Sequence, residues 1–202
     1  MGDVVGIVLA AGASTRMGQP KLLLPFGETT LLNATIAAVE ASRVDRVVVV
    51  TGCDAGRVEE SIVSNRVTVA RNPDYRRGNM SSFLTGVAAA PDGAAFLLVA
   101  GDLPTIQVAA VDAVEELWRA ARPWAVVAEY EDGVAHPFLL SDLAVEHVRH
   151  ARGDKVLWHA LVDPGDRRVV VVSLPYRAPA DVNERTDYER LLDPGDGTQR
   201  HR

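Results

Sequence analysis

Several residue types are scarce in this chain of 202 residues, and each scarcity excludes a class of protein. The single cysteine, Cys53, excludes an internal disulfide framework and a cysteine-based zinc ribbon, and it suits a reducing compartment. No apolar run approaches the ~20 residues that a membrane-spanning helix needs. With 21 basic against 27 acidic residues, the net charge of −6 argues against binding to nucleic acid or to an anionic membrane. We therefore expect a cytoplasmic protein that binds neither.

Apolar runs of strand length alternate with amphipathic runs of helix length along the whole chain. This alternation predicts an α/β fold with a mostly parallel, Rossmann-like sheet in three α/β/α layers. We expect one domain over residues 1–192 and a disordered tail over residues 193–202. The predicted strands are residues 4–10, 47–51, 67–70, 94–100, 125–130, 137–140 and 168–173. The predicted helices are residues 31–42, 55–64, 80–90, 108–121, 142–151, 155–162 and 186–192.

The loop after the first strand has the composition of a phosphate-binding loop. Ala10, Ala11 and Gly12 are small enough to let the backbone approach a ligand, and Arg16 and Lys21 add two cations. The loop has neither the Walker A pattern nor the G-x-G-x-x-G fingerprint of dinucleotide-binding proteins. A plain connecting turn is the alternative for the small residues alone, and the two cations favour binding of a polyphosphate.

Two other strand ends carry polar residues suited to a ligand. Asp102 follows the apolar run 94–100, where an ionised carboxylate is costly unless it is paired or holds a metal such as Mg²⁺. The alternative role for Asp102 is to cap the next helix. Residues 72–82, NPDYRRGNMSS, place Gly78 and Ser82 at the start of a helix. This pattern suits either a ligand or a simple helix cap.

The run LAAGASTRMGQPKLLLPFG resembles the signature of the MobA-like nucleotidyltransferases, and its LAAG and PKLLLP forms are closest to the molybdenum cofactor cytidylyltransferases. The resemblance implies the fold of the nucleotide-diphospho-sugar transferases. It also implies that Arg16 and Lys21 are catalytic residues that bind the triphosphate. The nucleotide would be contacted by residues at the end of the first strand: Leu9, Ala10, Ala11 and Gly12.

Motifs further along the chain extend the resemblance. GDLP matches the metal motif of the family, which makes Asp102 a Mg²⁺ ligand, and Gly78 and Ser82 match positions that help to select the base. Asn183 is a second metal ligand by this resemblance, although the most similar branch has aspartate there. Acceptor-binding positions are matched by His136, Asp154 and Asp181. Ala135 precedes His136 where the family has glycine.

The sequence thus predicts Mg²⁺-dependent transfer of a nucleoside monophosphate from an NTP, CTP by resemblance, to a phosphorylated acceptor, with release of pyrophosphate. The resemblance implies the molybdopterin form of the molybdenum cofactor as acceptor and a molybdenum enzyme as recipient of the product. The alternatives are a guanylyltransferase, a cytidylyltransferase for another phosphorylated acceptor, and a non-catalytic carrier or chaperone of the cofactor. A nicotinamide oxidoreductase is disfavoured because the dinucleotide fingerprint is missing.

Overall fold

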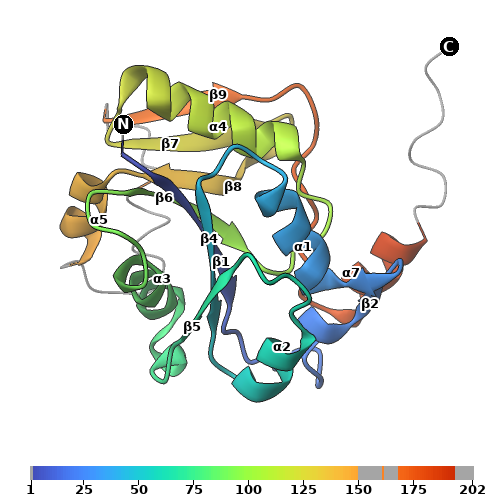
Figure 1. Ribbon diagram of the computed structural model, residues 1–202. Helices are drawn as coiled ribbons and strands as arrows, with labels where there is room; N and C mark the ends of the chain where they lie inside the picture. Colours follow the sequence, from blue (N-terminus) through green and yellow to red (C-terminus); the bar gives the residue numbers. More distant parts are fainter. Residues whose placement is uncertain (1, 150–160, 162–167, 194–202) are drawn as a thin grey trace, which may run out of the picture.

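A seven-stranded sheet forms the centre of the computed structural model, which describes residues 2–149, 161 and 168–193. The strand order is β5-β4-β1-β6-β8-β7-β9 (Figure 1). β8 runs antiparallel to β6 and β7, and the other neighbouring strands are parallel. This confirms the predicted mostly parallel sheet. The strands are β1 (Val4–Ala10), β4 (Arg46–Thr51), β5 (Thr68–Arg71), β6 (Ala95–Ala100), β7 (Ala125–Tyr130), β8 (Gly133–Leu140) and β9 (Val169–Ser173).

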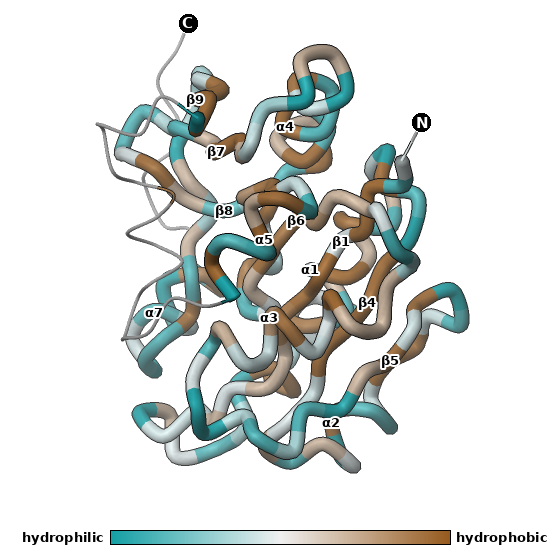
Figure 2. The backbone as a smooth tube through the Cα atoms, turned by 90° about the vertical axis from the view of Figure 1, so that its left-hand side faces the viewer, coloured by the Kyte–Doolittle hydropathy of each residue, from teal (hydrophilic) through white to brown (hydrophobic). Residues whose placement is uncertain are grey.

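Helices cover both faces of the sheet and create two hydrophobic cores. Alternate residues of a strand point to opposite faces, so Val4 and Val8 of β1 contribute to one core and Val5 and Ile7 to the other. Figure 2 shows the apolar strands enclosed between more polar outer segments. The first core includes α1 (Leu31–Glu40), α2 (Ala55–Ser61) and α4 (Val108–Ala121), whereas the second includes α3 (Asn79–Ala88) and α5 (Asp142–Arg149).

The hairpin of β7 and β8 differs from the prediction at one end. β8 begins at Gly133 rather than at residue 137. Its register with β7 shifts, because Val127 pairs with Phe138 while Ala128 pairs with Ala135. The two intervening residues, His136 and Pro137, are therefore an insertion in the ladder. Such a bulge accommodates a proline, which has no amide hydrogen for the ladder.

Several short elements were not predicted. They are η1 (Lys21–Leu23), η2 (Tyr75–Arg77) and a small antiparallel hairpin of β2 (Pro25–Phe26) and β3 (Thr29–Thr30). The closing helix, α7 (Arg185–Leu192), lies beside this hairpin (Figure 1). The Tyr188 hydroxyl donates a hydrogen bond to the carbonyl of Pro25 over 2.7 Å. This bond joins the end of the described chain to the segment that follows Lys21.

Some predictions fall outside the residues that the structure describes. They are the end of the predicted helix 142–151 at residues 150–151, the predicted helix 155–162 apart from residue 161, the acceptor position Asp154 and residues 194–202 of the tail. Among the described helices, none has both the length and the apolar character required to cross a membrane.

Candidate active site

The loop between β1 and η1 directs Lys21 toward the carboxyl edge of the sheet. The Ser14 hydroxyl accepts a hydrogen bond from the Lys21 amide over 3.1 Å and so holds the first residue of η1. Leu22, the next residue, is buried in the first core. The backbone of Lys21 is thus fixed from two sides, and its long side chain extends from a defined position.

Four of the predicted site residues meet at this edge, although they lie far apart in sequence. The Lys21 ammonium donates to the Asp102 carboxylate and lies 3.4 Å from the Asn183 amide oxygen. The Arg16 guanidinium donates to the same Asn183 oxygen over 3.2 Å. Lys21 and Asp102 are mostly shielded from solvent, with side chains 16% and 11% exposed. Two cationic side chains and two side-chain oxygens that can bind a metal therefore share one small, partly enclosed region.

The orientation of the Asn183 amide is set by Asp181 and Asp187. The Asn183 side-chain nitrogen donates to the Asp181 carboxylate, which leaves the amide oxygen facing Lys21 and Arg16. The Asn183 backbone amide donates to Asp187 over 3.0 Å, at the capping box that begins α7. Asp181 thus contacts the cluster through Asn183, and Asp187 is a positioning residue that the sequence analysis missed.

The Asp102 and Asn183 oxygens are ligands suited to a hard divalent cation. Mg²⁺ and Mn²⁺ prefer oxygen ligands, and Mg²⁺ commonly binds through one or two carboxylates together with substrate phosphates. The Asp102 carboxylate and the Asn183 amide oxygen already converge on one positive group, the Lys21 ammonium. No group of three or more histidine, cysteine or acidic side chains suited to a metal occurs within the described ranges. A metal here would therefore need further oxygen ligands, which a polyphosphate supplies.

The predicted nucleotide-contacting residues lie where β1 ends. Leu9 is partly buried, Ala10 and Ala11 are buried, and Gly12 is exposed at the start of the loop. The Leu9 carbonyl accepts from the Gly101 amide over 2.9 Å, which fixes the ends of β1 and β6 relative to each other. A Cβ atom at Gly12 would have no neighbour within 4 Å, so the backbone here is open to a ligand.

Gly78 and Ser82 lie at the start of α3, as predicted, but their surroundings differ. Gly78 is exposed and has a φ of +97°, a conformation that favours glycine. Ser82 is only 3% exposed, and its hydroxyl oxygen accepts from the side-chain amide of Asn72 over 3.0 Å. Asn72 is thus a second residue that the sequence analysis missed. The feature of the sequence that could have identified Asn72 is a polar residue directly after a strand.

His136 lies in the inserted pair of β8 and turns inward. Its Nδ1 is 3.1 Å from the Leu98 carbonyl of β6, and its ring lies 4.6 Å from the ring of Phe138. Burial lowers the pKa of His136, and this effect outweighs the Leu98 carbonyl and the nearby carboxylates, which raise it. The imidazole is therefore neutral at pH 7. Because its Nδ1–H donates to the Leu98 carbonyl, its Nε2 is left as a hydrogen-bond acceptor.

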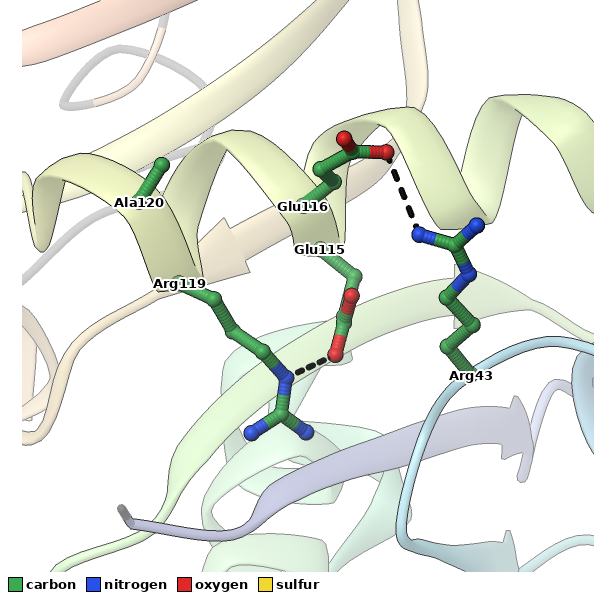
Figure 3. Close-up of a pocket in the computed structure, with 5 residues that line it drawn as sticks. All are labelled: Arg43, Glu115, Glu116, Arg119 and Ala120. Atoms are coloured by element: carbon green, nitrogen blue, oxygen red, sulfur yellow. Dashed lines mark hydrogen bonds and ion pairs between the residues drawn. The ribbon is translucent and has the colours of Figure 1, made fainter.

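A hollow between α4 and the loop that follows α1 is an alternative location for a ligand (Figure 3). Its charged side chains already pair with one another. Arg43 lies 3.2 Å from Glu116, and Arg119 binds Glu115 on the same helix. None of the site residues predicted from the sequence lines it. We therefore place the candidate active site at Lys21 and Asp102.

Comparison with known proteins identifies the class as an NTP transferase. The chain belongs to the MobA-like NTP transferase family, whose domain model matches residues 6–193. The molybdenum cofactor cytidylyltransferase of Escherichia coli K12 is 31% identical over 136 residues, which are 67% of this chain and 68% of that protein. The nicotine blue oxidoreductase of Paenarthrobacter nicotinovorans is 34% identical over 117 residues, 55% of this chain and 57% of that protein.

Solved structures with the same fold match over nearly the whole chain. The chain is similar to the crystal structure of Rv0371c from Mycobacterium tuberculosis H37Rv, with a TM-score of 0.85 and 30% identity over 95% of this chain and 98% of that one. A structure of Rv0371c in complex with manganese has a TM-score of 0.82 at the same identity and coverage. The chain is thus a nucleotidyltransferase of the MobA-like family.

Proposed function

We propose that the protein transfers a cytidylyl group from CTP to the phosphate of the molybdopterin form of the molybdenum cofactor, with Mg²⁺ as the metal. The observation that carries this proposal is the convergence of Arg16, Lys21, Asp102 and Asn183 at one edge of the sheet. The choice of CTP and molybdopterin rests on the LAAG and PKLLLP motifs. The 31% identity to a molybdenum cofactor cytidylyltransferase supports the same choice.

In the proposed reaction, an oxygen of the acceptor phosphate attacks the α-phosphorus of CTP. A new P–O bond forms, and the bond from the α-phosphorus to the bridging oxygen of the β-phosphate breaks. Pyrophosphate leaves with that electron pair. An acceptor phosphate is already ionised at neutral pH, so the reaction needs positioning and charge neutralisation rather than a general base.

The side chains divide this work. Arg16 and Lys21 neutralise charge on the triphosphate and on the departing pyrophosphate. Asp102 and Asn183 would hold the metal, and Asp181 fixes the side-chain amide of Asn183 so that its oxygen faces Lys21. Bound Mg²⁺ supplies further charge neutralisation on the phosphates. In this proposal Gly12 and Gly78 border the nucleotide, and His136 and Asp181 contact the acceptor. Asp154 is a further acceptor position by motif resemblance alone, because it lies outside the described residues.

A second candidate is an oxidoreductase, because the nicotine blue oxidoreductase is 34% identical over part of the chain. A thermal-shift panel with CTP, GTP, ATP, UTP and NADH, each with and without Mg²⁺, separates the candidates. A ligand at 100 times its Kd adds about 2.7 kcal/mol, which corresponds to several degrees at about 2–4 °C per kcal/mol. We expect a Mg²⁺-dependent rise that is largest with CTP. The largest rise with GTP would indicate a guanylyltransferase, and a rise with NADH alone would overturn the proposal.

A further inference from the structure

Asn72 is a buried side chain in which every polar group is used. It follows β5 directly and is 2% exposed. Its side-chain nitrogen donates to the hydroxyls of Ser81 and Ser82, each over 3.0 Å, and its side-chain oxygen accepts from the Asp74 amide over 2.9 Å. Its backbone amide donates to the Thr51 carbonyl of β4 over 2.8 Å. A fully satisfied buried amide fixes the segments that it joins.

The first turn of α3 depends on these bonds. Gly78 precedes the helix and has no side chain that could cap it. The Ser81 hydroxyl donates to the carbonyl of Gly78 over 2.9 Å or to that of Asp74 over 3.1 Å, which ties the start of the helix to the loop before it. Because Asn72 holds both serines, it determines where the Gly78–Ser82 turn lies relative to the sheet.

This turn belongs to a loop that packs against the nucleotide side of β1. Gly52, after β4, separates the two segments at close range. A Cβ atom at Gly52 would lie 2.7 Å from the Cβ of Tyr75 and 2.8 Å from the Cβ of Ala11. Tyr75 begins η2, which leads directly into Gly78. The loop that Asn72 fixes therefore borders the predicted nucleotide-contacting residues.

We infer that Asn72 is a positioning residue that sets the affinity and selectivity for the nucleobase. It acts through Ser81 and Ser82 on the Gly78–Ser82 turn and does not itself touch the nucleotide. This inference rests on the proposed function, because it requires a nucleotide at this edge. The triphosphate is bound separately by Arg16 and Lys21, so the two halves of the ligand can be tested independently.

The test compares binding of CTP, GTP and inorganic tripolyphosphate by calorimetry in the full chain. We expect Asn72→Ala to weaken CTP binding by roughly tenfold and to reduce the preference for CTP over GTP. Tripolyphosphate binding should stay within about twofold of wild type. A variant carrying both Ser81→Ala and Ser82→Ala should show the same loss, and adding Asn72→Ala to it should change little further.

Asn33 provides a matched control in another part of the fold. It is 6% exposed, and its amide donates to the Thr30 hydroxyl and the Ser61 carbonyl and accepts from the Val63 amide. Asn33→Ala should lower the Tm without altering the ratio of CTP to tripolyphosphate affinity. If Asn72→Ala fails to fold, Ser81→Ala alone decides, since Ser81 is not a predicted nucleotide contact and alanine is favourable within a helix.

Two results would overturn the inference. One is an unchanged affinity for both CTP and tripolyphosphate in both the Asn72→Ala and the serine variants. The other is an equal loss of CTP and tripolyphosphate binding, which would reflect general damage to the site. Wild-type protein that binds neither CTP nor tripolyphosphate would instead refute the proposed function itself.

Discussion

The contact between Lys21 and Asp102 gives a prediction with an unusual sign: removing the proposed catalytic lysine should strengthen metal binding. The Lys21 ammonium contacts the two oxygen atoms proposed to bind the metal, one from Asp102 and one from Asn183. A divalent cation that enters without nucleotide must first displace this ammonium. Lys21→Met removes the positive charge while it retains most of the length of the side chain.

The expected magnitude follows from the bond that is lost. A hydrogen bond to a charged group contributes about 1.5–3 kcal/mol, and each 1.4 kcal/mol is a factor of ten in affinity. Lys21→Met should therefore bind Mn²⁺ without nucleotide about 10- to 100-fold more tightly than wild type. The same variant should bind CTP more weakly and lose turnover, because the triphosphate loses a cationic partner.

The assay is a titration of free Mn²⁺ by electron paramagnetic resonance, with circular dichroism to verify folding. Arg16→Met is the control, because Arg16 contacts the Asn183 oxygen but has no described contact with Asp102. It should change Mn²⁺ affinity by a smaller factor. Lys21→Met that binds Mn²⁺ no more tightly than wild type would show that Asp102 and Asn183 are not the metal ligands.

Three further predictions concern single charges. Asp102→Asn keeps the shape of the side chain but removes its charge, so turnover should fall at least about a hundredfold with little change in Tm. Near-normal turnover would show that the Asp102 carboxylate is not needed for the reaction. Burial raises the pKa of Asp45, but the Val4 amide and the Arg119 guanidinium outweigh it, so the pKa is lowered overall. Asp45→Asn should therefore lower the free energy of unfolding by about 1 kcal/mol at pH 7, after allowance for solvent screening, and the difference should vanish as the pH falls below the ordinary value of 3.8. Urea titrations at pH 7 and pH 3 would measure it, and an equal difference at both would contradict it. The pKa of His136 is lowered by burial, so the folded state binds fewer protons than the unfolded state and loses stability as the pH drops below 6.5. His136→Gln should flatten the dependence of Tm on pH between 8 and 5, and an unchanged dependence would show that another group titrates.

The centre of the sheet could be predicted because strands β1, β4 and β6 are buried on both faces. The apolar runs of β1 and β6 have the length of buried strands and are too short for buried helices. The predicted bounds of the helix α4 match the structure. Strands of two residues carry no periodicity, so β2 and β3 were missed. β8 was predicted too short because a proline inside a strand normally indicates its start or its edge.

The candidate site was predictable in part. Asp102 and Lys21 could be predicted because they lie in the loops after β6 and β1, where an α/β fold binds its ligands. Asn183 lies 162 positions after Lys21, and residue spacing alone could not bring the two together; the motif resemblance did so. The role of Asn72 depends on three hydrogen bonds that no pattern in the sequence encodes.

The most direct test of the proposed reaction follows the transferred group itself. The full chain is incubated with Mg²⁺, molybdopterin and CTP that is radiolabelled at the α-phosphate, and the label and pyrophosphate are quantified. Label should move into the acceptor in amounts equal to the pyrophosphate released. CTP should be used in preference to GTP, and Lys21→Ala should abolish transfer without unfolding the protein. No transfer of label from any NTP by folded protein that binds CTP would contradict the account, and a carrier of the cofactor would then be the better description.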